Sequence, residues 1–311
     1  EVIYEERDGQ LYHIAYAVVG SDKKVIIATT RPETLLGDTA VCIHPQDERY
    51  AKLKGKQLIV PIANRKIPII EDEYVDMEFG TGCLKITPGH DFNDYEIGKK
   101  FALHEIDGVV HISKKLEDFA PLNIFTDTAH TNDNVPQQFQ DLDRFKVRKV
   151  VLEELKNKGL LVIEEKHPIS VPRGERSNIV IEPRLSYQWY VKTADMAKKA
   201  NAAVNKGEVK FHPNNWIKTY FNWMDNIQDW CISRQIWWGH RIPAWQDAEG
   251  NTYVGFDEEE VRSFYKLDNR KLNQVEDVLD TWFSSSLWSF GSLGWPNNTE
   301  GGERYFPTSL L

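Results

Sequence analysis

The sequence is poor in cysteine and contains no long apolar run. Its three cysteines, Cys42, Cys83 and Cys231, are odd in number and far apart. That spacing encodes neither a disulfide framework nor a paired-cysteine zinc site, so we expect a reducing compartment. No apolar run approaches the ~18–20 residues that cross a bilayer, and the acidic start over residues 1–7 is unlike a signal peptide. We therefore expect a cytoplasmic protein that has no membrane partner.

The sequence also lacks an excess of positive charge. Asp and Glu number 47 against 38 Lys and Arg, which gives a formal net charge of −9. An acidic chain is poorly suited to non-specific coating of nucleic acid, although local basic patches can still contact a phosphate backbone. Hydrophobic residues make up 41% and charged residues 27%, which is ordinary for a globular protein and excludes a wholly disordered chain.

The length of 311 residues predicts about two domains, at roughly 100–200 residues each. Composition changes near Thr193, where an alanine-rich helix predicted over 195–204 leads into a tryptophan-rich stretch. We therefore place the domains at 1–192 and 193–311. The chain begins without methionine and ends on the apolar residues 309–311, from which we expect a segment of a longer protein.

Residues 1–192 predict a mixed α+β fold with a β-barrel-like sheet. Helical spacing of apolar residues predicts peripheral helices over 91–103 and 137–158, the second ending at Gly159. Short apolar runs separated by turns predict strands over 11–18, 24–30, 40–44, 57–61 and 84–87.

A threonine-rich run follows the second of these predicted strands. Pro32 keeps Arg31 extended, so hydroxyls and backbone amides are displayed where the sheet ends. The more ordinary interpretation is a turn whose hydroxyls bond their own backbone. The residues alone leave both roles open for Thr29, Thr30, Arg31 and Thr34.

Two glycines and two carboxylates mark a second motif. Gly80 and Gly82 allow a backbone to approach a ligand closely. Asp91 takes the position of a helix N-cap, and Asp94 falls in the first helical turn. Capping and the helix dipole by themselves account for both carboxylates, so a purely structural role stays open.

The same carboxylates also permit a binding site. Held ionised at a helix start beside Lys85 and Thr87, they form a polar pocket for an ammonium group and a hydroxyl. A metal site built on His90 with the carboxylates would need further histidines that the sequence does not place nearby. We therefore predict no metal.

Four segments, in the order of that family, together resemble the bacterial valyl-tRNA synthetase family of class I, and the match extends over nearly the whole chain. The string HDFNDYE and the run QIWWGH, residues 235–240, resemble the valyl branch rather than the isoleucyl or leucyl branches. The segments are Thr29–Asp38 (TTRPETLLGD), Gly80–Gly98 (GTGCLKITPGHDFNDYEIG), Asp229–Trp245 (DWCISRQIWWGHRIPAW) and Asp277–Pro296 (DVLDTWFSSSLWSFGSLGWP).

The resemblance also identifies what is missing. The ATP-activation signatures HIGH and KMSKS occur nowhere in the sequence. The resemblance therefore implies that this chain forms no aminoacyl adenylate and needs no cofactor, whereas the full-length parent uses ATP and Mg²⁺. Residues 1–192 resemble the editing domain, and 193–311 resemble a partial α/β nucleotide-fold segment of the catalytic domain. Some relatives carry zinc-binding cysteine pairs near 171–180 and 244–254, but these stretches have no cysteine here, so we predict no zinc.

The activity implied by the resemblance is post-transfer editing, the hydrolysis of mischarged threonyl-tRNA(Val). A pocket shaped for valine cannot strongly exclude the nearly isosteric threonine, so a second site must accept threonine and reject valine. The resemblance implies that Asp91 holds the α-ammonium and Asp94 the side-chain hydroxyl, with Lys85 and Thr87 completing the catalytic set. Its implied substrate-binding residues are Thr29, Thr30, Arg31, Thr34, Phe79 and His90.

Two of these residues have further expected roles. Phe79 would pack on the terminal adenosine, while His90 would serve either as a base or as a supporting, capping residue. The expected partners are the tRNA(Val) acceptor end and a threonine moiety, and the parent is expected to be a monomer. An alternative is a module that binds the acceptor end without turning it over. A complete ligase is disfavoured by the missing ATP motifs.

Overall fold

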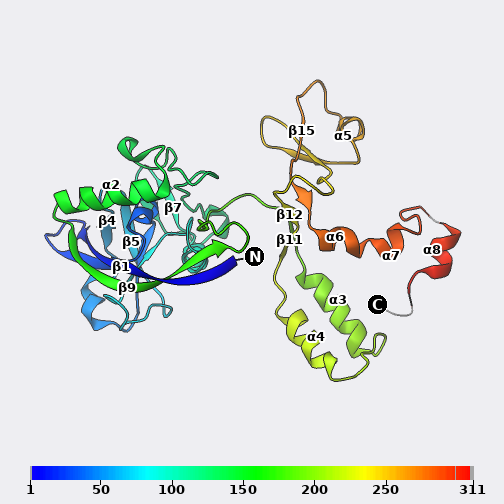
Figure 1. Ribbon diagram of the computed structural model, residues 1–311, viewed down its shortest axis with the longest axis horizontal. Coiled ribbons are helices and arrows are strands. Elements are labelled where there is room, and N and C mark those ends of the chain that lie inside the picture. Colours follow the sequence, from blue (N-terminus) through cyan, green and yellow to red (C-terminus); the bar gives the residue numbers. More distant parts are fainter. Residues whose placement is uncertain (1, 298, 309–311) are drawn as a thin grey trace. The chain divides into compact units, whose positions relative to one another are not determined.

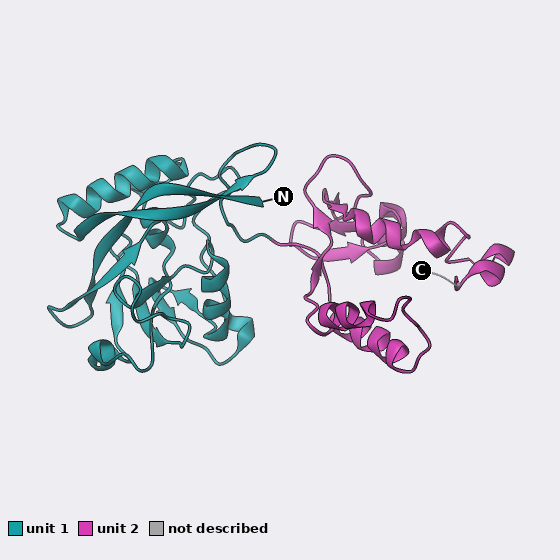
Figure 2. Cartoon of the chain, turned by 60° about the horizontal axis from the view of Figure 1, so that its bottom comes forward, with its two compact units in different colours: residues 1–186 teal, residues 187–311 magenta. Residues whose placement is uncertain are grey.

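The computed structural model describes residues 2–297 and 299–308. Two compact units divide the chain, unit 1 over residues 1–186 and unit 2 over residues 187–311 (Figure 2). The division lies earlier than the expected boundary after residue 192. The reason is that Tyr190–Val191 (β10) pairs with Trp230–Cys231 (β11), which draws the segment before residue 193 into unit 2.

Unit 1 is a mixed α+β structure, as predicted. Its two α-helices are α1 (Phe92–Lys100) and α2 (Arg144–Asn157), and its 3₁₀ helices are η1 (Pro32–Gly37), η2 (Glu48–Leu53), η3 (Leu116–Asp118) and η4 (Gln137–Phe139). Its strands are β1 (Val2–Val18), β2 (Lys24–Thr29), β3 (Ala40–Ile43), β4 (Gln57–Ile59), β5 (Lys66–Glu71), β6 (Cys83–Ile86), β7 (His104–Ile106), β8 (Val109–His111) and β9 (Leu161–Gly174).

These nine strands form one sheet whose main path runs β2-β1-β4-β5-β3-β6. Most pairs are antiparallel, whereas β5 runs parallel to β3 and to β8. The terminal strands of this path, β2 and β6, are not hydrogen-bonded to each other within the described residues, so the sheet is not a closed barrel. The barrel-like part of the prediction was therefore too specific, because short apolar runs show strands but not closure.

A long antiparallel ribbon of β1 and β9 extends beyond the body of unit 1 (Figure 1). Pairing runs from Val2 opposite Gly174 to Ile14 opposite Leu161, with an irregularity after His13. The outer half of β1 is largely exposed, whereas residues from Leu11 onward are buried or half-buried. Only the inner half of β1 is the apolar run that predicts a strand, so the sequence-based strand began at Leu11.

The core of unit 1 lies between the sheet and α2. Helix α2 buries Val147, Val151 and Leu155 in the same cluster as Leu35 and Leu36 of η1. Asp143 caps α2 by accepting the N–H groups of Phe145 and Lys146, so the helix begins at Arg144 rather than at residue 137.

Unit 2 is built from short elements around a small core of Trp245, Val261 and Leu272. Its described strand pairs are all antiparallel, which leaves the predicted nucleotide-fold segment without a parallel sheet of its own. Among the described residues, no helix has the length and apolar character needed to span a membrane. The remaining elements are β12 (Ser233–Arg234), β13 (Ala244–Gln246), β14 (Thr252–Val254), β15 (Asn273–Gln274), β16 (Val278–Leu279), α3 (Ala194–Asn205), α4 (Trp216–Asp225), α5 (Glu258–Tyr265), α6 (Thr281–Ser286), α7 (Trp288–Gly291) and α8 (Glu300–Tyr305).

Candidate functional site

One cleft in unit 1, with a volume of about 260 Å³, brings together all ten residues that the sequence singled out. They come from the end of β2, the turn and η1 that follow it, the loop before β6, the end of β6, and the loop and first turn that begin α1. Five further residues complete its wall without having been predicted. The predicted residues are Thr29, Thr30, Arg31, Thr34, Phe79, Lys85, Thr87, His90, Asp91 and Asp94, and the additional ones are Leu11, Ala28, Tyr74, Leu84 and Asn93.

The threonine run forms a turn in which threonine hydroxyls bond the nearby backbone, which is the more ordinary of the two roles expected from the sequence. Thr29 Oγ1 accepts the backbone N–H of Arg31 at 3.0 Å, and Thr34 Oγ1 donates to the Arg31 carbonyl at 3.0 Å. Thr29 can therefore still donate a hydrogen bond to a ligand, and Thr34 can still accept one. Thr30 Oγ1 has no hydrogen-bond partner within the described ranges, so its hydroxyl has the greatest freedom to bind a ligand.

Asp91 is the N-cap of α1, and capping uses only part of its carboxylate. Its Oδ1 accepts the N–H groups of Asn93 at 2.8 Å and Asp94 at 3.0 Å. The side chain lies at the exposed rim of the cleft, and its other oxygen, Oδ2, makes no hydrogen bond to the described chain. The capping and binding interpretations are therefore compatible, one for each oxygen.

Asp94 lies deeper, with only 6% of its surface exposed. Its Oδ2 accepts the backbone N–H of Thr87 at 2.8 Å, while Oδ1 has no partner among the described residues. Burial raises the pKa of Asp94 to about 7, and the charges of Asp91 and Asp38 add to this effect against the opposing influences of Lys85 and the Thr87 N–H. A buried carboxylate with a free oxygen is suited to pairing with a hydroxyl or an ammonium group.

Lys85 and Thr87 are engaged with a carboxylate that sequence reasoning did not assign to the site. Asp38 Oδ1 accepts the Thr87 hydroxyl at 2.7 Å and the Lys85 ammonium at 3.2 Å, and Lys85 also bonds the Thr87 hydroxyl. Tyr16 donates to Asp38 Oδ2 at 2.7 Å. The Lys85 charge is thus balanced within the protein rather than displayed freely toward a substrate.

His90 is held as a neutral, supporting residue. Its Nε2 accepts the backbone N–H of Ile124 at 2.9 Å, and its Nδ1 lies 2.9 Å from the Pro183 carbonyl, to which it donates. Burial, together with the charges of Arg31 and Lys85, lowers the pKa of His90 to about 3. Because both ring nitrogens have protein partners, the geometry favours the supporting role over the role of a base.

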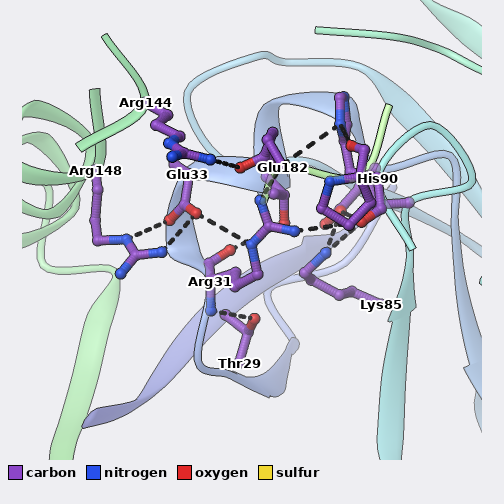
Figure 3. A network of polar contacts seen from close by, with 12 residues as sticks. Thr29, Arg31, Glu33, Lys85, His90, Arg144, Arg148 and Glu182 are labelled. Atoms are coloured by element: carbon purple, nitrogen blue, oxygen red, sulfur yellow. Dashed lines mark hydrogen bonds and ion pairs between the residues drawn. The ribbon is translucent and has the colours of Figure 1, made fainter. Parts of the chain in front are cut away.

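Arg31 is the centre of a chain of alternating charges (Figure 3). Its guanidinium bonds Glu33 at 3.3 Å and also pairs with Glu182. Glu33 in turn binds Arg148 twice, at 2.7 Å each, and Glu182 lies 3.6 Å from Arg144. Burial is the largest influence on the Glu33 carboxyl and opposes ionisation, but the Arg148 and Arg31 contacts outweigh it and lower its pKa. Arg31 is therefore fixed in place by its neighbour Glu33 and by Glu182, which lies 151 positions away in the sequence.

A second groove of about 500 Å³ adjoins the cleft and shares Thr30, Arg31, His90 and Asp91 with it. Phe92 and Phe145 line this groove, and the Phe92 side chain is 79% exposed. The groove also contains Arg7 and the charged network around Arg31. That network has three arginines and two glutamates, so it carries one net positive charge. Exposed rings beside guanidinium groups are suited to stacking and backbone contacts with a single-stranded nucleic acid.

Carboxylates outnumber unpaired cations in the cleft. Asp38 and Asp94 lie near the Lys85 ammonium, Asp91 lies at the rim, and Arg31 is already paired with two glutamates. This balance favours a cationic group such as an α-ammonium. The described part of the chain contains no cluster of three or more histidine, cysteine or carboxylate side chains that could hold a metal ion.

Comparison with known proteins adds independent findings. The family model described as class I tRNA synthetases (I, L, M and V) matches residues 1–311. The valine–tRNA ligase of Legionella pneumophila (strain Paris) is 54% identical over 100% of this chain, and that of Francisella tularensis is 53% identical over the same share. The chain covers 32% of each of these proteins, so it spans about a third of their length.

A solved structure is also similar in part. It is the ternary complex of Agrobacterium radiobacter K84 agnB2 LeuRS with tRNA and LeuAMS, at 16% identity and a TM-score of 0.33, covering 92% of this chain and 31% of that one. A similarity this weak carries no argument about the site.

Proposed function

The chain belongs to the class I tRNA synthetase family, on its valyl branch, and from this premise we propose that unit 1 hydrolyses the ester of threonyl-tRNA(Val). The observation that carries the proposal is the pair of carboxylates at the start of α1. Asp91 and Asp94 each have one oxygen bound to the backbone and one oxygen without a partner in the described chain. Two free carboxylate oxygens in one cleft match the two polar groups of a threonyl ester, its ammonium and its hydroxyl.

We assign the ammonium to Asp91 and the hydroxyl to Asp94. The rim position of Asp91 suits a group that stays partly hydrated, whereas the buried Asp94 suits a hydroxyl held away from water. A hydrogen bond to a charged group contributes about 1.5–3 kcal/mol, or about 10- to 150-fold in affinity. Valine would leave the Asp94 oxygen unpaired, which gives the site its preference for threonine.

The reaction we propose is attack of water on the ester carbonyl carbon. The new carbon–oxygen bond replaces the bond to the ribose oxygen, which leaves with a proton as the terminal hydroxyl, and threonine is released. With His90 neutral and fully bonded, the protein contributes mainly by orienting the ester and stabilising charge. The adjoining groove, with Phe92 and the arginines, would hold the single-stranded acceptor end.

The test is to incubate the 311-residue chain with threonyl-tRNA(Val) and valyl-tRNA(Val) and to follow ester loss. Faster loss of the threonyl ester than in the absence of protein is expected, with little effect on the valyl ester. A chain that binds tRNA but leaves both esters at their spontaneous rates would support the alternative, a non-catalytic acceptor-end binding module. The engagement of Lys85 and Thr87 with Asp38 is the observation that favours this alternative.

The whole-protein activity belongs to a longer polypeptide. Relatives named valine–tRNA ligase are about three times the length matched here. We propose that the parent of this chain joins valine to tRNA(Val) with ATP and Mg²⁺, while the present residues supply editing. Pyrophosphate exchange with valine by the 311-residue chain should therefore be nil.

A further inference from the structure

The Asp38 carboxylate is an unusual feature in the interior of unit 1. It is 0% exposed and is flanked in the sequence by Gly37 and Thr39, which are also buried. The three side chains that donate to it are Tyr16, Lys85 and Thr87. Burial, the largest influence, raises the pKa of Asp38 while these three contacts lower it.

A buried carboxylate is a costly way to stabilise a fold. Removing a charge from water carries a large penalty, and apolar residues of similar volume often replace a buried ion pair without loss of stability. Two of the three donors to Asp38 line the cleft, whereas the third, Tyr16, lies wholly inside the core. Asp38 therefore bonds mainly to side chains that line the cleft and to only one side chain of the core.

We propose that Asp38 is the positioning residue of the site, acting through Lys85 and Thr87 without touching the substrate. This inference rests on the proposed editing activity and assigns a role within that site. Asp38 Oδ1 receives both donors, so one atom fixes the position of the Lys85 ammonium and of the Thr87 hydroxyl.

The effect extends one step further, to Asp94. Thr87 donates its hydroxyl to Asp38 and its backbone N–H to Asp94, at 2.7 and 2.8 Å. Thr87 therefore bridges the two carboxylates, and its position determines where the Asp94 carboxylate lies in the cleft. Loss of the Asp38 charge would release the Lys85 ammonium toward Asp94, where it would compete with a substrate ammonium or hydroxyl for the free oxygen.

The test uses the 311-residue chain and single-turnover hydrolysis of threonyl-tRNA(Val). Asp38→Asn should lower the rate constant at saturating protein by about 10- to 100-fold, while the half-saturating protein concentration changes by less than about threefold. Tyr16→Phe is the matched control, because it removes a hydrogen bond to the same carboxylate but leaves both cleft contacts intact. Its rate constant should stay within about threefold of wild type.

A double-mutant cycle separates positioning from a general structural role. In a Lys85→Met/Thr87→Val background, Asp38→Asn should cause no further loss of rate, because the groups through which it acts are gone. If the losses multiply instead, or if Tyr16→Phe slows the reaction as much as Asp38→Asn does, the inference is overturned.

A second variant covers the case in which Asp38→Asn does not fold, which circular dichroism would show. Thr87→Val removes only the hydroxyl that reaches Asp38 and should slow hydrolysis about tenfold or more, whereas Thr87→Ser should restore the rate. Full activity of Thr87→Val would overturn the inference. A wild-type chain without threonyl hydrolysis would instead overturn the proposed function, so the two failures are distinguishable.

Discussion

Asp94 Oδ2 accepts the backbone N–H of Thr87 at 2.8 Å, which ties the first turn of α1 to the end of β6. This bond occupies one carboxylate oxygen and leaves the other for a ligand. The same residue thus holds the cleft together and, in our proposal, distinguishes threonine from valine. The two roles can be separated, because an amide retains the first and changes the second.

Asp94→Asn should weaken selectivity more than it weakens the fold. The amide oxygen still accepts the Thr87 N–H, but a neutral partner provides a bond about half as strong as a charged one. Threonyl-tRNA hydrolysis should slow while the penalty against valyl-tRNA shrinks, so the two rates converge. Measuring both ester hydrolysis rates in wild type and variant tests this, and an unchanged ratio would mean that the hydroxyl is recognised elsewhere.

The same variant should become more stable than wild type as pH rises. The pKa of Asp94 is raised to about 7 by burial, so the folded state binds this proton more tightly than the unfolded state does. The stability that this proton contributes is complete below about pH 4 and is lost as pH rises through about 7. Asp94→Asn does not ionise and escapes that loss.

Urea unfolding at pH 5 and pH 8 measures this difference. We expect the stability of Asp94→Asn relative to wild type to increase from pH 5 to pH 8 by at most about 3 kcal/mol, because part of the effect of a shift of about three pKa units is already lost below pH 5. Asp72→Asn is the control, since the pKa of Asp72 is lowered in the folded protein, with burial opposing and the Lys100 and Tyr74 contacts favouring ionisation. This carboxylate is ionised in both the folded and the unfolded state from pH 5 to pH 8, so the stability difference between Asp72→Asn and wild type should not change over this range. A pH-independent difference for Asp94→Asn would contradict the raised pKa.

Asp91 permits a test of capping against ligand binding. Serine is also a good N-cap, so Asp91→Ser should keep the thermal stability of wild type while losing the free oxygen that we assign to the ammonium. Asp91→Ala should lose both, with a stability cost of about 0.5–2 kcal/mol. Thermal melts and threonyl ester hydrolysis rates of both variants distinguish the two roles. If Asp91→Ser still hydrolyses the ester at the wild-type rate, Asp91 serves only as the helix cap.

The sequence predicted which residues surround the cleft because they lie in short runs next to strand ends and a helix start. The run from Lys85 to Asp94 brings five of them within ten residues, so local geometry alone brings them together. Asp38 lay inside a motif already noticed, TTRPETLLGD, but nothing local shows that its carboxylate turns inward to meet residues almost fifty positions later.

Contacts between residues that only the complete fold brings together could not be predicted from the sequence. Glu182 pairs with Arg31 across 151 positions, and it reaches Arg31 only because β9 returns along β1. The state of His90 likewise depends on Ile124 and Pro183, which belong to separate loops. Residue type and spacing identify candidates, whereas protonation and partners are decided by these distant contacts.

Replacing His90 with alanine should lower the stability of the protein but leave the shape of the pH profile of hydrolysis unchanged. Its pKa is lowered to about 3, chiefly by burial, so it stays neutral across the assay range. His90→Ala leaves the Ile124 N–H without its acceptor, which costs about 1–3 kcal/mol. The measurement is the logarithm of the threonyl hydrolysis rate between pH 5.5 and 8.5. A limb that disappears in the variant would show that His90 titrates during the reaction.

The last prediction concerns the loop that carries Phe79, whose ring is 59% exposed above the cleft. Asp47 holds the Arg49 guanidinium, which donates to the Met77 carbonyl at 2.6 Å. Gly82 has a φ of +72°, and a Cβ there would lie 2.3 Å from the Arg49 guanidinium. The absent side chain therefore makes room for the contact that fixes the loop.

Arg49→Met should free the loop without disturbing the floor of the cleft, because Arg49 touches none of the carboxylates around Lys85. If Phe79 packs on the terminal base, the variant should raise the half-saturating protein concentration for threonyl-tRNA(Val) by about three- to tenfold and leave the rate constant at saturation nearly unchanged. Lys54→Met, which alters a neighbouring cation bound to the Pro45 carbonyl and Glu71, is the control and should change neither value. Phe79→Ala should reproduce the Arg49→Met effect, and the two should not add, since both act through the same ring. Full additivity would show that Arg49 serves the fold of the loop and has no part in placing Phe79 over the substrate.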